Sequence, residues 1–162
     1  MASFAEVQTA YLQFPERVQS LMLSTVTKDG QPQASYAPFI MEGDRTFYIF
    51  VSGLSNHTQN LKTTARAGIL LIEDEAQANQ IFARQRLMYD CTVEQLARHH
   101  PQWTIQADKL TARFGNLITM LRQLPDFQMF KLTPESGRFV VGFGAAYTVN
   151  SSNLNQLIPT ET

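Results

Sequence analysis

The sequence predicts a mainly β protein with flanking helices, an α+β fold whose strands run antiparallel. Three β-forming segments, at 21–27, 32–41 and 46–51, are separated by short turn signals, and the first turn contains Asp29-Gly30. Such segments predict an antiparallel meander whose edges must be closed or covered. A 3.6-residue apolar stripe between 104 and 124 predicts a long helix packed on the sheet or on a partner subunit.

The first helix is predicted from a capping pattern. Ser3 and Glu6 have the spacing of a capping box, in which each side chain pairs with the backbone N–H of the other residue. Pro15 then interrupts the segment, so we expect a break or a second short helix there. Further along, the apolar segment 68–72 predicts a strand with both faces buried.

The second half of the chain predicts three more strands. The alternation over 81–91 predicts a strand that carries Arg84 and Arg86 on one face. Two guanidinium groups on one face can bind a phosphate or carboxylate through paired hydrogen bonds. A solvated strand face, or ion pairs with the acidic turn 73–75, would explain the two arginines equally well. A capping-box pattern at 92–95 predicts a short helix that ends near His99-His100-Pro101.

The C-terminal part is predicted as two strands, 127–132 and 138–147, separated by a turn at 133–137. Gly142 and Gly144 suggest a bulge, a barrel corner or a close approach by a ligand. We expect one domain over 1–150. The polar segment 151–162 is expected to be a tail that is loose or docks on a neighbouring subunit.

Composition excludes several classes of protein. The 162 residues, 44% of them hydrophobic, are enough for one domain with a real core. A net charge of −1 gives no electrostatic reason to expect nucleic acid or an anionic membrane as partner. The single cysteine, Cys91, cannot form an internal disulfide and is expected to be buried. We expect a cytoplasmic protein without a signal peptide or a membrane span.

The most informative stretch is the junction of a strand and a helix between 47 and 61. Small polar residues fill this junction and the start of the helix: Ser52, Gly53, Ser55, Asn56, His57 and Thr58. The first N–H groups of a helix lack partners, and the helix dipole favours negative charge there, so this corner suits an anion such as a cofactor phosphate. The simpler alternative is that Ser55 or Asn56 caps the helix.

Other polar residues give weaker evidence for a functional site. His99 and His100 are adjacent, so they do not share a helix face as metal ligands four residues apart would, and we expect a surface helix end and no metal site. Asp126 is interpreted as a turn residue, with a role in a pocket as the alternative. The sequence contains no Walker loop, zinc motif or Ser-His-Asp order.

Several motifs together resemble one known family. These are SYAPF at 35–39, FYIFVSGL at 47–54, HTQNL at 57–61, FARQRL at 82–87 and GFGAA at 142–146. They resemble the pyridoxamine-5′-phosphate-oxidase-related, FMN-binding split-barrel proteins, and among these the haem-utilisation (HugZ-like) branch. The resemblance covers about 5 to 150 and implies a six-stranded antiparallel split β-barrel, a homodimer and a ligand pocket at the dimer interface.

The resemblance also implies the cofactor contacts. The expected residues are Ser35 and Tyr36 on one strand, Phe50, Val51 and Ser52 beside the ring, Ser55, Asn56 and His57 at the phosphate corner, and Arg84, Gln85 and Arg86 of the second subunit. No catalytic residue is assigned.

Two cofactors follow from the resemblance. The main expectation is an FMN-binding, flavin-dependent oxidoreductase whose substrate is unknown. The family's arginine and lysine on the strand occupied here by 33–38 are absent, which argues against oxidation of pyridoxamine phosphate. The alternative is a haem-binding or haem-degrading protein. The tail carries no histidine to serve as the iron ligand of that branch, so a surrogate such as His57, Tyr147 or another tail residue would be needed. A cofactor-free dimeric relative is the third possibility.

Overall fold

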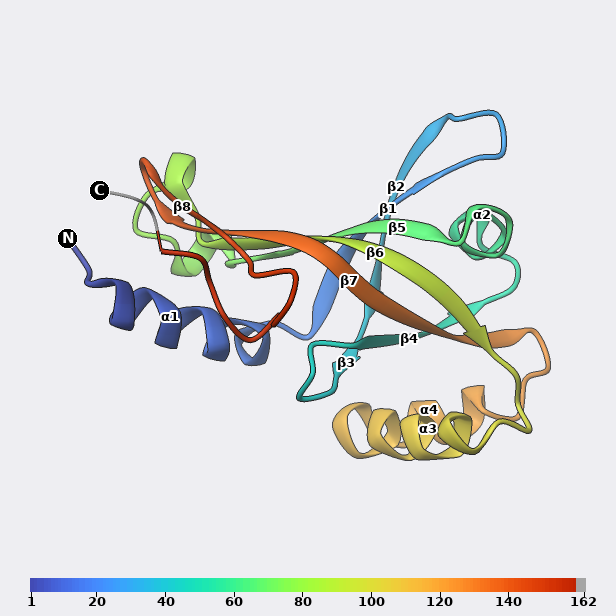
Figure 1. Cartoon of the computed structure of the whole chain (residues 1–162). Coiled ribbons are helices and arrows are strands. Elements are labelled where there is room, and N and C mark those ends of the chain that lie inside the picture. The colour runs from blue at the N-terminus through green and yellow to red at the C-terminus, as the bar shows by residue number, and fades with distance from the viewer. Residues whose placement is uncertain (160–162) are drawn as a thin grey trace.

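The computed structural model describes residues 1–159, and its main feature is one antiparallel sheet of eight strands (Figure 1). The strands are β1 (Ser20–Val26), β2 (Pro32–Pro38), β3 (Ile40–Met41), β4 (Phe47–Ser52), β5 (Arg66–Ile72), β6 (Arg86–Leu96), β7 (Phe127–Gly142) and β8 (Ala145–Thr148). Their order is β2-β1-β5-β6-β7-β4-β3, with β8 paired to β7. The edge strands β2 and β3 do not pair with each other, so the sheet is curved but open. The expected antiparallel split-barrel architecture is therefore confirmed.

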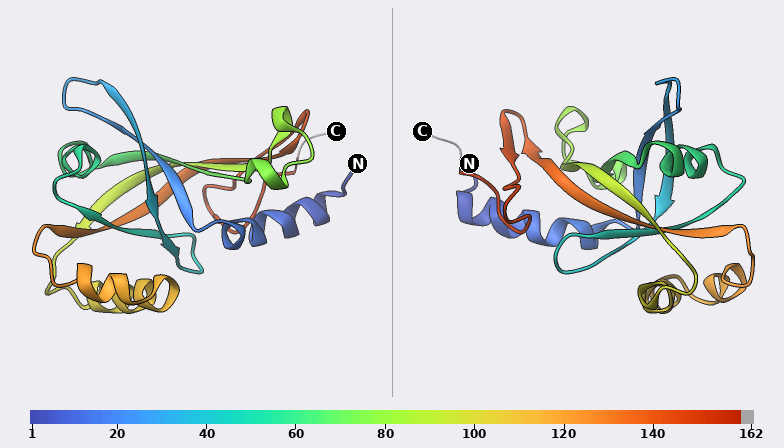
Figure 2. Two further views of the ribbon diagram at one scale, coloured as in Figure 1. Left: turned by 180° about the vertical axis from the view of Figure 1, so that it is seen from behind. Right: turned by 45° about the vertical axis from the view of Figure 1, so that its right-hand side comes forward.

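The helices lie around this sheet (Figures 1 and 2). They are α1 (Phe4–Gln13), α2 (Asn56–Thr64), α3 (Pro101–Phe114) and α4 (Asn116–Leu121), with the 3₁₀ helices η1 (Phe14–Arg17), η2 (Glu75–Gln77) and η3 (Ile81–Ala83). α1 and the α3–α4 pair cover opposite faces of β4. α2 lies at one end of β5, and η2 and η3 lie at the other end. In the described part of the chain, no helix is long and apolar enough to cross a membrane.

Strand β4 explains how the core is built. Phe47, Ile49 and Val51 belong to a cluster between the sheet and α1, whereas Tyr48 and Phe50 belong to a second cluster under α3 and α4. Successive side chains of a strand point to opposite faces, so an uninterrupted apolar strand is expected where both faces are covered. The apolar run FYIFV is the sequence form of a strand that lies between two cores.

Several local predictions are confirmed. Ser3 and Glu6 form the capping box of α1: Ser3 N donates to Glu6 Oε2 at 2.6 Å, and Glu6 N donates to Ser3 Oγ at 3.2 Å. η1 begins at Phe14, one residue before Pro15. The β1–β2 hairpin turns at Gly30, whose φ of 83° lies in the left-handed region that glycine reaches without strain.

The turn expected at 133–137 is wrong. β7 continues from Phe127 to Gly142, because this segment pairs with β6, including Cys91 with Pro134 and Tyr89 with Gly137. A register shift between Asp90 and Cys91 accommodates the irregular stretch. The chain reverses only at Gly144, whose φ is 66°, so the expectation of an irregularity at the C-terminal glycines is confirmed.

The expected boundaries between 81 and 124 also change. Residues 81–83 form η3, and β6 begins only at Arg86. The capping-box pattern at 92–95 starts no helix, because these residues pair with β7 up to Leu96 and Met129. Ladder pairing outweighs a local capping preference that is worth only about 1 kcal/mol. The helical region is divided at Gly115, whose φ is 83°.

Two further expectations are corrected. The expected strand 32–41 divides at Phe39 into β2, which pairs with β1, and β3, which pairs with β4, so the first strands do not form a simple meander. The short strands β3 and β8 bring the count to eight instead of the expected six. β5 buries one face only: Leu71 is fully buried, whereas Leu70 and Ile72 on the other face are half-buried.

The described part of the tail packs on its own chain, which differs from the expectation of a loose or neighbour-docked segment. Leu157 is buried in the α1 cluster. Gln8 of α1 donates to the carbonyl of Asn155 at 2.9 Å and accepts from the Leu157 N–H at 2.8 Å. The last residues of the predicted tail, 160–162, lie outside the described range.

Candidate functional site

A groove between β2 and α2 brings predicted site residues together from distant parts of the chain. Its open volume is about 540 Å³. It is lined by Gln33, Ala34, Ser35, Tyr36, Ser55, Asn56 and His57. Five of these residues were predicted from the sequence to contact a cofactor. β2 is the edge strand of the sheet, so its outer edge is available to form one wall.

Local hydrogen bonds start α2 at this groove. The Thr58 hydroxyl donates to the Ser52 carbonyl at 2.6 Å, and the Ser55 N–H donates to the same carbonyl at 3.2 Å. These bonds turn the chain directly from β4 into the helix. Ser55 occupies the N-cap position of α2, but its side chain makes no capping hydrogen bond, so the capping alternative is wrong for Ser55. The first turn of α2 therefore faces the groove without a capping side chain over it.

His57 is the most distinctive side chain of the groove. Its Nδ1 lies 2.9 Å from Ser35 Oγ, and the Ser35 hydroxyl donates to the Leu23 carbonyl at 3.4 Å. The contact with Ser35 orients the ring, and the tautomer of His57 decides which of the two atoms donates. Nε2 is buried and has no hydrogen-bond partner among residues 1–159.

The ring of His57 is neutral at neutral pH. Burial disfavours the charged imidazolium and lowers the pKa of His57 below its usual 6.5. A neutral imidazole with one nitrogen fixed by a neighbour and the other free is the form in which histidine ligates metals. The other groove residues are also uncharged, so within one chain the groove offers dipoles and a nitrogen donor rather than a cation.

Asn60 is a residue of this region that the sequence reasoning missed. It is buried one helical turn after His57, and its Nδ2 donates to Thr25 Oγ1 at 3.0 Å and to Gln33 Oε1 at 2.8 Å. These bonds fix α2 against the β1–β2 hairpin. The three-residue spacing from His57 places both on one helix face, which is the signal that identifies Asn60.

The predicted ring contacts on β4 point elsewhere. Phe50 packs edge-on against Trp103, with ring centroids 5.9 Å apart, and Val51 lies in the α1 cluster. Ser52 donates through its hydroxyl to Asp126 Oδ2 at 3.2 Å and accepts from the Leu54 N–H. None of these three side chains lines the groove. Asp126 holds the β4–α2 corner, as the interpretation of a turn residue expects.

Arg84, Gln85 and Arg86 lie at the opposite end of the sheet from the groove. Arg84 donates through Nε to the Glu73 carbonyl at 2.9 Å and pairs with Glu75 at 3.3 Å. Gln85 accepts from Arg17, and Arg86 donates to the Arg84 carbonyl. Within one chain, Arg84 therefore pairs with the acidic turn, which is the alternative to anion binding that the sequence left open. These residues can meet a groove only across a subunit boundary.

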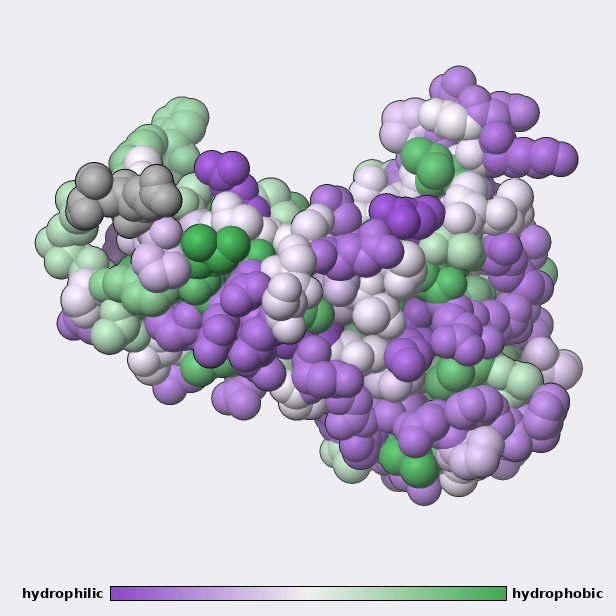
Figure 3. Space-filling model, viewed as in Figure 1, coloured by the Kyte–Doolittle hydropathy of each residue, from purple (hydrophilic) through white to green (hydrophobic). Residues whose placement is uncertain are grey.

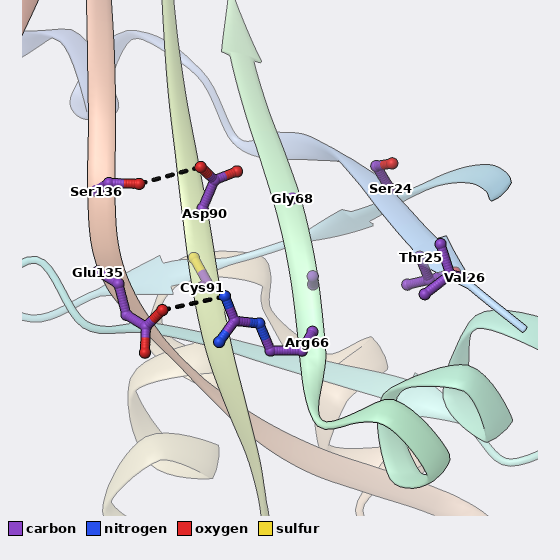
Figure 4. A pocket seen from close by; sticks show the side chains of 10 residues that line it. Ser24, Thr25, Val26, Arg66, Gly68, Asp90, Cys91, Glu135 and Ser136 are labelled. Carbon is purple, nitrogen blue, oxygen red and sulfur yellow. Dashed lines mark hydrogen bonds and ion pairs between the residues drawn. The ribbon is translucent and has the colours of Figure 1, made fainter. Parts of the chain in front are cut away.

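A second concave surface, of about 380 Å³, lies on the sheet beside the C-terminal end of α2 (Figure 4). Its charged side chains are already paired: Arg66 with Glu135 at 3.1 Å, and Asp90 with Ser136 at 3.0 Å. Cys91 lies beneath it, and burial raises the pKa of its thiol to about 12, so it is no nucleophile at neutral pH. The described residues contain no cluster of three metal-ligating side chains. The groove with His57 is therefore the candidate site.

Comparison with known proteins places the groove in a family context. Residues 7–141 match the family model described as pyridoxamine 5′-phosphate oxidase. The chain is 37% identical over 149 residues to the haem oxygenase HutZ of Vibrio cholerae, a match that covers 92% of this chain and 84% of HutZ.

Solved structures agree with this comparison. HutZ of Vibrio cholerae, described there as a haem storage protein, has a TM-score of 0.74 and 34% identity over 83% of this chain and 92% of its own. ChuZ of Campylobacter jejuni has a TM-score of 0.83 and 29% identity over 100% of this chain and 68% of its own. A haem-binding protein of Mycobacterium smegmatis has a TM-score of 0.78 over 96% of this chain and 61% of its own, and its 20% identity shows the fold alone.

Proposed function

We propose that this chain, which belongs to the pyridoxamine 5′-phosphate oxidase family, binds haem in the groove between β2 and α2. His57 lines this groove. HutZ of Vibrio cholerae, which is 37% identical in the sequence comparison and 34% identical in the structural one, is named as a haem protein in both, which supports the choice of ligand. Binding is the core of the proposal. Haem, when bound, would supply the redox chemistry of its iron.

The observation that carries this proposal is the state of His57. A buried polar atom without a partner costs free energy, about 1–3 kcal/mol, so the orphaned Nε2 is best explained by a partner that the isolated chain lacks. The lowered pKa keeps the ring neutral, and Ser35 orients the ring through Nδ1 while Nε2 stays without a partner. These properties fit an iron ligand and fill the place of the tail histidine that the sequence lacks.

Haem titration of the purified protein tests this proposal. We expect a Soret band that saturates with one haem per groove in the wild type and is lost or strongly weakened in His57→Ala. His99→Ala is the matched control, because His99 is exposed near the start of α3 and far from the groove in the fold. Equal haem affinity in wild type and His57→Ala would overturn the assignment of the site.

FMN is the second candidate ligand, with one observation in its favour. The first turn of α2 faces the groove and carries no capping side chain, so its N–H groups and dipole are available to a phosphate. The protein would then be a flavin-dependent oxidoreductase in which Arg84 and Arg86 of a second subunit supply the missing positive charge. His57→Ala combined with Arg84→Ala should weaken FMN binding more than tenfold, roughly the effect of losing charge-assisted contacts. Equal FMN affinity in this variant excludes that site.

We also propose that the protein is a homodimer that pairs through the outer face of the sheet. A row of apolar side chains crosses four paired strands on this face: Tyr36, Met22, Leu70 and Met88. Tyr36 and Met22 are exposed, and the other two are half-buried. Figure 3 shows the surface hollowed above the sheet, between the end that carries the β1–β2 hairpin and the end that carries η3.

Light scattering tests the dimer. Met22→Asp should place a charge in the interface and shift the protein to the monomer. Leu12→Asp is the matched control, because Leu12 has the same exposed fraction, 43%, but lies on α1, on the opposite side of the sheet. A monomeric wild type, or a dimer that Met22→Asp leaves intact, would refute this interface.

A cytoplasmic location is part of the same proposal. It is supported by the single free cysteine, Cys91, which suits a reducing compartment. Cell fractionation with an epitope-tagged protein tests it, and recovery in a secreted or membrane fraction would contradict it.

A further inference from the structure

The outer part of the β1–β2 hairpin has few attachments to the rest of the sheet. β1 pairs with β5 from Met22 to Ser24, so the next pair along the hairpin, Thr25 with Gln33, lies beyond the ladder with β5. Figure 1 shows this part of the hairpin projecting from the sheet beside α2. Two strands without a third are marginally stable in water, so the position of the hairpin depends on contacts other than its own ladder.

Asn60 of α2 makes such a contact. Its side chain is buried, and its Nδ2 donates to Thr25 Oγ1 at 3.0 Å and to Gln33 Oε1 at 2.8 Å. These two acceptors belong to one cross-strand pair, so a single amide joins both strands of the hairpin to the helix. Among the side chains of residues 1–159, no other hydrogen-bonds the hairpin segment 25–33 to an element outside it.

The contact between His57 and Ser35 joins the same two elements. His57 lies three residues before Asn60 on α2, and Ser35 lies two residues after Gln33 on β2, so each pair shares one face of its element. His57 Nδ1 lies 2.9 Å from Ser35 Oγ. α2 and β2 are therefore joined by two neighbouring polar contacts, one inside the groove and one that is buried.

We propose that Asn60 is a positioning residue for the ligand site: its amide holds the hairpin against α2 and so keeps Ser35 within reach of His57. The inference rests on the proposed function and deepens it, because it assigns the spacing of the two groove walls to a residue outside the groove. Asn60 does not line the groove itself. It acts on a ligand only through the residues that do.

Hydrogen exchange of the protein without ligand tests the contact itself. Asn60→Ala should raise amide exchange over 25–35, because the hairpin loses its side-chain link to α2. Gln59→Ala is the matched control: it removes the neighbouring amide of the same helix, but Gln59 is exposed and donates to the Gly53 carbonyl at 3.3 Å. Should Asn60→Ala fail to fold, Gln33→Ala removes one of the two bonds at its half-buried end and carries the same test.

Haem titration then tests the effect on the site. Asn60→Ala should weaken haem binding about tenfold, the lower end of the effect of losing a group that orients a metal ligand. Arg45→Met is the control for general destabilisation. It also removes buried hydrogen bonds, but these join the β3–β4 turn to α1 and the tail, away from the groove, so it should bind haem as the wild type does.

A double-substitution cycle separates positioning from a purely structural role. In the Ser35→Ala background, the contact that Asn60 maintains is already lost. Adding Asn60→Ala should therefore weaken haem binding by a smaller factor than it does in the wild type. A residue with only a structural role would lower the affinity by the same factor in both backgrounds.

The outcomes are distinguishable. Unchanged hairpin exchange in Asn60→Ala, unchanged haem affinity, or equal factors in both backgrounds overturns the positioning role and leaves the proposed function intact. A wild type that binds neither haem nor FMN overturns the proposed function, and the role of Asn60 at the site with it. Faster hairpin exchange together with a non-additive loss of haem affinity supports the inference.

Discussion

Replacing Ser35 by alanine tests how the groove prepares His57. The hydroxyl of Ser35 lies 2.9 Å from His57 Nδ1 and donates to the Leu23 carbonyl at 3.4 Å. Ser35→Ala removes this partner without changing the charge or volume of the groove appreciably. The imidazole loses the hydrogen bond that fixes its orientation.

The expected magnitude follows from the geometry. A half-buried hydrogen bond contributes about 1 kcal/mol to stability, so the fold should survive the change. The effect on a metal ligand is larger, because loss of the hydrogen bond that orients a ligating histidine typically costs about 10- to 100-fold in metal affinity. We therefore expect haem affinity to fall by about that factor while the unfolding transition shifts only slightly.

The assay is a haem titration followed by the Soret band, together with urea unfolding of the same samples. Ser55→Ala is the matched control: it makes the same chemical change in the same groove, but the Ser55 side chain makes no capping hydrogen bond. The reasoning is refuted if Ser35→Ala binds haem as tightly as Ser55→Ala and the wild type.

Three further predictions concern pH and packing. Haem affinity should be constant above about pH 6.5 and fall as the pH drops through the lowered pKa of His57, because the protonated ring cannot ligate iron. The free energy of unfolding should fall over the same pH window, because the unfolded chain takes up this proton at a higher pH than the folded chain does. Neither trend should persist in His57→Ala. Gly137→Ala should destabilise the protein by about 1–3 kcal/mol in urea unfolding, because a Cβ there would lie 2.6 Å from Tyr89 Cε1 and 2.9 Å from the Met88 carbonyl oxygen; an unchanged midpoint contradicts this. Arg45→Met should cost about 1–3 kcal/mol, because buried Arg45 donates to Asn155 at 3.1 Å and to the Tyr11 carbonyl at 3.2 Å, and a thermal melt equal to wild type would show that these bonds contribute nothing.

The sequence was most informative where local chemistry and final structure agree. The run of apolar residues in β4 and the small polar residues after it predicted a strand that feeds a helix, and the groove forms at that junction. Ser35 and His57 were connected only through family resemblance, because 22 residues separate them and no local pattern indicates that they meet. The resemblance supplied the long-range contact that periodicity cannot show.

The errors have physical causes. The polar and glycine-containing stretch 133–137 looks like a turn, but pairing with β6 on one side holds it in the ladder. The capping pattern at 92–95 is overridden in the same way. Leu70 and Met22 lie on a face of the sheet that the chain leaves partly open, so their side chains are less buried than their hydrophobicity predicts.

The same limit applies to Arg84. The sequence predicts that it contacts an anion, but within one chain it pairs with the acidic turn and does not reach the groove. Residues that act across a subunit boundary leave only an indirect signal in the sequence, namely apolar side chains that the folded chain fails to cover.

Absorption spectra of wild type and His57→Ala, recorded during separate titrations with haem and with FMN, test the central claim most directly. The account predicts a saturable Soret band in the wild type, its loss in His57→Ala, and its retention in His99→Ala. A Soret band of equal strength in His57→Ala, or retention of FMN with no haem binding, would contradict the claim that His57 makes this groove a haem site.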